Sequence, residues 1–260
     1  MIHFGRVPKT IVVAFMVVAV GALGARAAQK TEAEKMFEED VIKTETGDLK
    51  ITFLGHASLA FAYQGKVLYV DPVGNPAGTP VDYSKMPQAD IVLVTHEHFD
   101  HLDPKAISVL RKEQTRTILT KACAEKVSGG SVMKNGDVLT VQGIKIEAVP
   151  AYNIVQKRPD GQPFHPKGSG NGYILNFDKT RVYVAGDTES IPEMKQLQKI
   201  DIALLPMNLP YTMTPEMVAD AAKAFQPKIL YPYHYGQTDP NKLIDLLKDS
   251  KTQVRVRQMK

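Results

Sequence analysis

The chain has 260 residues, of which 43% are hydrophobic and 23% are charged, a balance that is typical of a globular protein and excludes a disordered or fibrous one. The formal net charge is +4, but Arg6, Lys9 and Arg26 are the only charged residues among the first 27, so the remaining chain carries about +1. A nucleic-acid-binding protein normally has a strong basic face, and this near-neutral chain disfavours that class.

The first 27 residues have the layout of a secretory signal peptide. Basic residues precede the apolar run IVVAFMVVAVGAL, which leads to the small-residue pattern Ala25-Arg26-Ala27. The run is shorter than the roughly 20 residues that a helix needs to cross a bilayer, so we expect no stable membrane span once the signal is removed. We predict cleavage after Ala27 and export to the periplasm or the medium, with an uncleaved N-terminal anchor as the alternative.

Residues 28–48 and residues 49–260 differ in character. The first segment is polar and acidic and contains helix-forming residues, so it is interpreted as a leader helix or linker. The second is predicted to be a single domain. It opens with LKITFLGHASLAFAYQGKVLYVDP, in which apolar and polar residues alternate on both sides of Gln64-Gly65, and this pattern predicts two antiparallel strands.

The next segments predict strands and helices in alternation. The apolar run IVLVT predicts a strand that is buried on both faces, and PKAISVLRK, with Pro104 at its first position, predicts a helix. A strand at RTILT, a helix at KACAEKV and a hairpin that turns at Asn135-Gly136 follow. The only cysteine, Cys123, lies in the second helix, where we expect a buried apolar residue rather than a functional thiol.

The loop at residues 151–172 is long and rich in proline and glycine, as functional or disordered loops often are. Beyond it the sequence predicts a hairpin and then helices alternating with strands, one helix beginning at Thr214 and Pro215. Strands followed by alternating strands and helices, twice over, predict an α/β fold. We expect an αββα sandwich of two mixed β-sheets packed face to face, with helices on the outer faces.

Four groups that can bind a metal follow the buried strand within six positions: His96, His98, Asp100 and His101. Imidazole and carboxylate groups bind zinc at about 2 Å, so several of them must converge from one rigid place, and a loop leaving a buried strand is such a place. The alternative is a polar loop that only caps the next helix, as Asp103 before Pro104 would do. The density of ligands favours a metal site.

This pattern resembles the His-x-His-x-Asp-His signature of the metallo-β-lactamase superfamily, and the similarity extends over nearly all of residues 49–260. The resemblance implies three further ligands. The matching positions are His165 in FHPKGSGNGY, Asp187 in VYVAGDT and His234 in ILYPYHYG. It also implies how two metal ions would be held: one by His96, His98 and His165, the other by Asp100, His101 and His234, with Asp187 bridging them.

Within the superfamily, the motifs LGHAS, GDT and HYG resemble the branch that contains ascorbate-6-phosphate lactonase and N-acyl phosphatidylethanolamine phospholipase D. His56 of LGHAS is either a structural histidine or a catalytic residue that faces the metals. Asp71 either orients a ligand imidazole or begins a turn with Pro72. No cysteine lies near the motifs, which disfavours β-lactamase activity, and His98 stands where flavodiiron proteins have a carboxylate, which disfavours redox iron chemistry.

The resemblance therefore implies an exported hydrolase that contains two divalent metal ions. Zinc is favoured, and the donor set also accepts manganese or iron. A metal-bound hydroxide, oriented by Asp100, would attack an ester, lactone or phosphodiester. The substrate is expected to be a small molecule, and if it is anionic it could meet Lys157, Arg158 and Lys167, which are otherwise solvated. The alternatives are a non-catalytic metal-binding or ligand-binding protein and an iron-dependent oxidoreductase.

Overall fold

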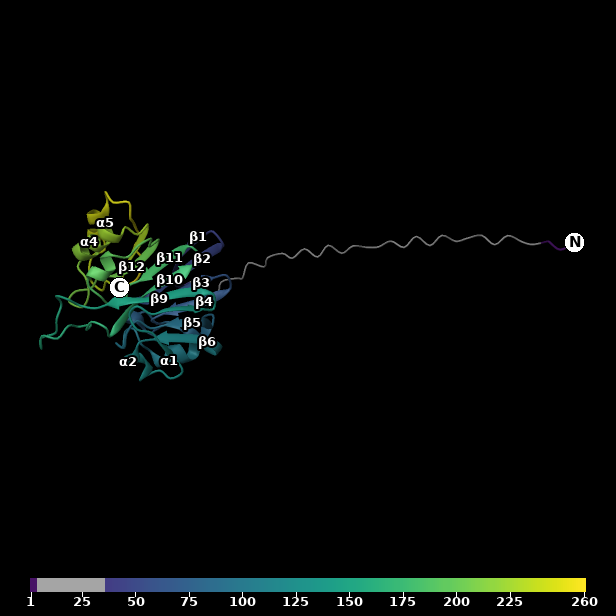
Figure 1. The fold of residues 1–260 in the computed structure, drawn as a ribbon, viewed down its shortest axis with the longest axis horizontal. Coiled ribbons are helices and arrows are strands. Elements are labelled where there is room, and N and C mark those ends of the chain that lie inside the picture. Colours follow the sequence, from purple (N-terminus) through teal and green to yellow (C-terminus); the bar gives the residue numbers. More distant parts are fainter. Residues whose placement is uncertain (4–35) are drawn as a thin grey trace.

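The computed structural model describes residues 1–3 and 36–260 (Figure 1). The predicted signal peptide, apart from its first three residues, and residues 28–35 of the predicted leader lie outside the described residues. Among the helices of the described part, none is long and apolar enough to cross a membrane.

The first half of the domain forms a seven-stranded sheet in which the strands lie in chain order. The first four strands are antiparallel, and β4 to β7 are parallel to one another. The strands are β1 (Glu38–Thr44), β2 (Gly47–Gly55), β3 (Ser58–Tyr63), β4 (Lys66–Val70), β5 (Ala89–Leu93), β6 (Arg111–Leu119) and β7 (Ser131–Val132). Two short helices, α1 (Pro104–Leu110) and α2 (Lys121–Ala124), connect the parallel strands.

The second half repeats this plan in a second seven-stranded sheet. Again the first four strands are antiparallel and the last four are parallel. The strands are β8 (Val138–Val141), β9 (Ile144–Ala151), β10 (Gly170–Phe177), β11 (Thr180–Val184), β12 (Ile202–Pro206), β13 (Ile229–Tyr233) and β14 (Gln253–Val254). The helices are α3 (Pro192–Lys195), α4 (Pro215–Phe225) and α5 (Asn241–Leu247).

The two sheets pack against each other through aromatic side chains. Phe61 of β3 stacks on Phe177 of β10 at 5.8 Å between ring centroids, and Phe53 of β2 meets Tyr231 of β13 at 4.9 Å. In Figure 1, α1 and α2 lie at one side of the strands and α4 and α5 at the opposite side. This arrangement confirms the predicted sandwich, because parallel strands need helical crossovers that cover the outer faces.

Strand β5 is buried on both faces, as predicted. Ile91 and Leu93 belong to the core between the sheets, whereas Val92 belongs to a second apolar cluster that includes Ile107 and Leu110 of α1. The loop that follows β5 therefore leaves a strand that is fixed by packing on both sides.

The interpretation of residues 28–48 as a leader helix or linker is wrong from residue 38 onward, where β1 pairs antiparallel with β2. Two acidic residues of this segment, Glu38 and Asp40, have partners in the C-terminal part of the chain. Asp40 accepts hydrogen bonds from Tyr231, Arg255 and Arg257, and the last of these bonds is 2.6 Å long. The domain therefore begins about ten residues before the predicted boundary.

Two predicted strand pairings were also wrong. The segment predicted as two strands contains three, because the chain turns at His56 between β2 and β3 as well as at Gln64-Gly65. The Asn135-Gly136 turn joins β7 of the first sheet to β8 of the second, and the hairpin turns instead at Gln142-Gly143, where both residues have positive φ. The predicted helix starts at Pro104 and Thr214 are confirmed, since Asp103 and Thr214 cap α1 and α4.

Replacing Asp40 by Ala should lower the free energy of unfolding of the metal-free protein by about 1–3 kcal/mol at pH 7, because it leaves two arginines without their partner. Burial raises the pKa of Asp40, but hydrogen bonds from Tyr231 and Arg257 outweigh it and lower that pKa below its usual value. This contribution is therefore present above the unfolded pKa near 4 and is lost as the pH falls through the lower folded pKa.

Urea denaturation at several pH values measures the effect. The matched control is Asp48→Ala, which removes an exposed ion pair with Lys43 from the neighbouring strand and should cost less than about 1 kcal/mol. Equal losses in the two variants at pH 7 would contradict the structural role of Asp40.

Candidate metal centre

The His-x-His-x-Asp-His segment lies in the loop between β5 and α1. The backbone N–H groups of His101 and Leu102 both donate to the carbonyl of His98, at 3.0 and 2.8 Å, so the loop curls before the helix begins. Asp103 caps α1 by accepting bonds from the N–H groups of Lys105 and Ala106. Helix capping thus accounts for Asp103, and the four residues of the motif before it are free for another purpose.

All seven predicted ligands come together, as members of three overlapping groups. In each group, one nitrogen or oxygen from every residue lies within 4.8 Å of the others. The groups are His96, His98 and His165; His96, His101 and Asp187; and His56, Asp100, His101 and His234. His56, which sequence reasoning left between a structural and a catalytic role, is therefore part of the cluster.

Asp187 occupies the middle of the cluster. Its Oδ2 lies 3.2 Å from Nε2 of His165, 3.4 Å from Nε2 of His234 and 3.9 Å from Nε2 of His96. Its Oδ1 lies 3.4 Å from Nε2 of His101. One carboxylate thus contacts imidazoles from the first half of the chain and from the second.

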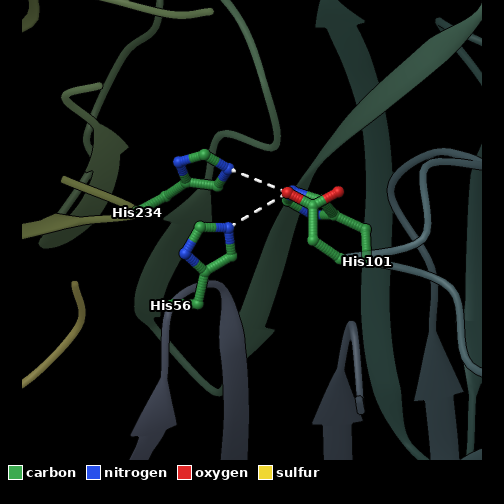
Figure 2. A group of neighbouring side chains, drawn as sticks. His56, His101 and His234 are labelled. Atoms are coloured by element: carbon green, nitrogen blue, oxygen red, sulfur yellow. Dashed lines mark hydrogen bonds and ion pairs between the residues drawn. The ribbon is translucent and has the colours of Figure 1, made fainter. Parts of the chain in front are cut away.

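A second carboxylate, that of Asp100, also lies close to His101 and His234. Its Oδ2 is 3.1 Å from Nε2 of His56, 3.5 Å from Nε2 of His234 and 3.9 Å from Nε2 of His101. Figure 2 shows the rings of His56 and His234 side by side, both pointing toward the side of the cluster where His101 lies. Asp100 is the more exposed of the two carboxylates, with 28% of its side chain accessible against 4% for Asp187.

The inward-facing atoms of the cluster fit a metal ion. Nε2 of four histidines and Oδ1 of Asp187 are buried and make no hydrogen bond, and these histidines are His96, His101, His165 and His234. Buried polar atoms in proteins nearly always have a partner, because an unsatisfied one costs free energy. Several such atoms within a few ångströms of one another, all of ligand type, are the arrangement that a divalent cation satisfies.

The outward-facing nitrogens of three of these rings, those of His96, His101 and His165, are fixed by hydrogen bonds. Nδ1 of His101 lies 2.8 Å from Asp71, Nδ1 of His165 lies 2.7 Å from Asn153, and Nδ1 of His96 lies 3.0 Å from the Thr95 hydroxyl. Such bonds fix the orientation of ligand imidazoles and leave the other nitrogen to bind. Asp71 therefore orients a ligand, whereas no pattern in the sequence pointed to Thr95 or Asn153.

The charges of the cluster suit a cation. Burial raises the pKa of Asp187, but His234 and His101 outweigh it and hold that pKa well below its usual range. Burial also raises the pKa of Asp100, but the nearby imidazoles of His234 and His56 outweigh the effect and lower it. Burial, together with neighbouring histidines, lowers the pKa of His96. At neutral pH the carboxylates are ionised and His96 is neutral, which is the state in which each binds metal.

A cavity of about 680 Å³ opens onto this cluster. Its wall includes Phe99, Phe164 and Tyr211, together with the cations Lys126 and Arg158. Of the three basic loop residues singled out in the sequence, only Arg158 lines the cavity. Lys157 pairs through its backbone with Pro163, and Lys167 forms an ion pair with Glu193. The sequence predicted only that Lys126 lies in a helix, and the tertiary structure brings it to the cavity wall.

Comparison with known proteins places this fold and cluster in a family. Residues 50–234 match the model of the β-lactamase superfamily domain. A UPF0173 metal-dependent hydrolase of Koribacter versatilis is 33% identical over 207 residues, which cover 72% of this chain and 84% of that protein.

Two solved structures are also similar. One, from Parabacteroides distasonis and assigned as a metal-dependent hydrolase, is 51% identical with a TM-score of 0.81 and covers 86% of this chain and 100% of its own. A metallo hydrolase from Ignicoccus hospitalis is 26% identical with a TM-score of 0.68, covering 81% of this chain and 95% of its own. The chain therefore belongs to the metallo-β-lactamase superfamily and is a metal-dependent hydrolase.

Proposed function

We propose that the protein is an exported hydrolase with two divalent metal ions, preferably zinc, that cleaves an ester, lactone or phosphodiester bond in a small molecule. The observation that supports this best is Asp187, whose two carboxylate oxygens face unpaired imidazole nitrogens on both sides. A carboxylate in that position can bridge two cations. Export is inferred from the signal-peptide layout of residues 1–27.

The donor atoms divide between two positions. His96, His98 and His165 would hold one ion, and Asp100, His101 and His234 the other, with Asp187 shared. When bound, two such ions supply Lewis acidity toward a substrate oxygen and lower the pKa of water toward neutrality. Both positions are made of imidazole and carboxylate without thiolate, a set that zinc, manganese and iron accept.

The remaining roles fall to residues that line the cavity. Asp100 is ionised and partly exposed there, so its carboxylate can accept a hydrogen bond from the attacking water and orient it. Lys126 and Arg158 can bind an anionic group of the substrate, while Phe99, Phe164 and Tyr211 offer apolar surface. This combination favours a substrate that carries both a negative charge and an apolar part.

β-Lactamase activity of the cysteine-containing type is disfavoured on structural grounds too. Cys123, the only cysteine, is buried beside Thr120, and burial raises the pKa of its thiol to about 11. It is absent from the three ligand groups found among the described residues. A non-catalytic binding protein would have no need for a complete ligand set. Iron-dependent oxidation is distinguished from hydrolysis by the metal that the protein retains.

Purified protein should retain two metal ions per chain, and Asp187→Ala should reduce this number to one or fewer because the shared ligand is lost. Elemental analysis after dialysis measures the stoichiometry and identifies the metal. Asp103→Ala is the matched control in the same region, since it removes the cap of α1 and a hydrogen bond from the N–H of Gly74 but no predicted ligand, and it should cost about 1–3 kcal/mol of stability with no loss of metal. Two ions retained in Asp187→Ala would show that the ligand assignment is incorrect, and two iron ions would favour an oxidoreductase.

The zinc-loaded or manganese-loaded protein should hydrolyse at least one member of a panel of aryl esters, lactones and phosphodiesters, and should leave β-lactams intact. Removal of the metal by a chelator should lower the rate by more than about 100-fold, and addition of the metal should restore it, since the attacking water depends on it. Full metal occupancy with no turnover of any ester, lactone or phosphodiester would refute the proposed reaction.

Arg158→Ala and Lys126→Ala should each raise KM for an anionic substrate by about 5- to 30-fold. The reason is that each variant removes a charge-assisted hydrogen bond, which contributes about 1.5–3 kcal/mol inside a protein and less where solvent has access. They should leave KM for a neutral analogue nearly unchanged. Lys157→Ala, which removes a cation outside the cavity wall from the same loop, is the control. If all three variants behave alike, the cavity cations do not select the substrate.

A further inference from the structure

We infer that His56 is a further protein ligand of the metal position formed by Asp100, His101 and His234 with the shared Asp187, an assignment that rests on the proposed two-metal site. The family signature assigns no ligand at this position, which lies in the turn between β2 and β3. If His56 binds metal, this position is richer in protein ligands than the resemblance implied.

The distances around Asp100 suit atoms that share one cation. Atoms bound to zinc at 2.0–2.2 Å and separated by angles of about 90–120° lie about 2.8–3.8 Å from one another. Nε2 of His56 and Nε2 of His234 lie 3.1 and 3.5 Å from the same oxygen, Oδ2 of Asp100. One ligand atom from each of the four residues lies within 4.8 Å of the others. Nε2 of His56 is thus closer to Asp100 than Nε2 of His234 is.

The hydrogen-bond partner of Nδ1 shows that, in the neutral ring of His56, Nε2 is the nitrogen with a free lone pair. Nδ1 lies 3.0 Å from the main-chain oxygen of Lys260, which can only accept, so Nδ1 carries a proton and donates it. In the neutral ring, Nε2 then has a lone pair, and it points at a carboxylate oxygen that also only accepts. A cation between these atoms resolves the conflict, and a metal ion does so for His56, Asp100 and His234 together.

A similar arrangement occurs at three of the predicted ligands. His101, His165 and His96 each direct Nδ1 at a protein oxygen and Nε2 at the centre of the cluster, and His56 follows that pattern with Lys260 as its partner. A ring held in this way is oriented for binding before the ion arrives.

The backbone of His56 is also fixed by its surroundings. His56 has a φ of 51°, in the left-handed region that non-glycine residues seldom occupy, so the turn is constrained by its surroundings. The carbonyl of His56 accepts a bond of 2.9 Å from the N–H of His234, and the two ring centroids lie 3.8 Å apart. This bond joins the turn of the first sheet to the end of β13 in the second.

The C-terminal segment, residues 255–260, supports the Lys260 oxygen. Arg257 binds Asp40 of β1, and the N–H of Gln258 donates to Glu38 at 2.6 Å. Met259 is fully buried, and its carbonyl accepts a bond from the N–H of Tyr235. Strand β1 and this segment therefore position His56 from outside the cluster.

Metal affinity and the spectrum of the cobalt-substituted protein test the assignment without reference to activity. His56→Asn tolerates the left-handed backbone and is too short to reach the ion, so it should keep the fold, checked by circular dichroism. Titration with a chromophoric chelator should show that one of the two ions binds at least 10-fold more weakly, while the other is unaffected. The visible d–d bands of bound cobalt should change for the weakened position only.

Two further variants separate binding from hydrogen bonding. His56→Gln keeps a group that can donate to Asp100, and it should fail to restore the affinity. Lys260→Ala, which keeps the main-chain oxygen, should behave as wild type. Affinities within twofold of wild type and an unchanged cobalt spectrum in His56→Asn would overturn the assignment. Full recovery in His56→Gln would also overturn it, because it would show that His56 only donates to Asp100.

The proposed function and this assignment fail in distinguishable ways. A wild-type protein that binds two ions and hydrolyses nothing refutes the reaction, and the affinity comparison still decides the role of His56. A wild-type protein that binds a single ion, with an affinity that does not depend on His56, overturns both the two-metal site and the assignment.

Discussion

The structure depends on one electrostatic constraint, a buried carboxylate surrounded by imidazoles. Asp187 is almost entirely excluded from solvent and lies 3.2–3.9 Å from ring nitrogens of four histidines. Burying an isolated carboxylate is very costly, and burying several imidazoles with unpaired nitrogens adds to that cost. The arrangement is stable only with positive charge at its centre, which is why the same residues that build the cluster also make it a metal site.

The repeated topology explains how one edge of the sandwich assembles this cluster. His56 follows β2 and His165 follows β9, the corresponding strand of the second half, while Asp71 and Asp187 follow the corresponding strands β4 and β11. The two halves use these equivalent positions differently. Asp71 lies behind His101 and orients it, whereas Asp187 lies at the centre.

Hydrogen bonds and ion pairs that cross between the sheets also fix the geometry. The bond between the backbones of His56 and His234 joins a turn of the first sheet to a strand end of the second. The ion pairs of Asp40 with Arg255 and Arg257 join the first strand to the segment after the last one. In the proposed function, the metal cluster would carry out the reaction and the wall of the cavity, where Phe99 is 88% exposed, would select the substrate.

The sequence alone predicted the sandwich and the candidate ligands. Dense local spacing marked His96 to His101, the resemblance to the superfamily pointed to His165, Asp187 and His234, and the twofold succession of strands and helices predicted the layers. The predicted strands were wrong at β1 and at the turns near His56 and Asn135. A local pattern does not reveal which distant strand a segment will pair with.

The remaining features of the site appear only in the folded chain. It places His56 against Asp100, Asn153 behind His165, and Lys126 and Arg158 at one cavity. His56 and Asp100 follow different strands of the first sheet, and Lys126 and Arg158 come from different halves of the chain, so their positions depend on strand pairing and on how the two sheets pack. That packing is the sum of many side-chain contacts in the core, and no single motif records it.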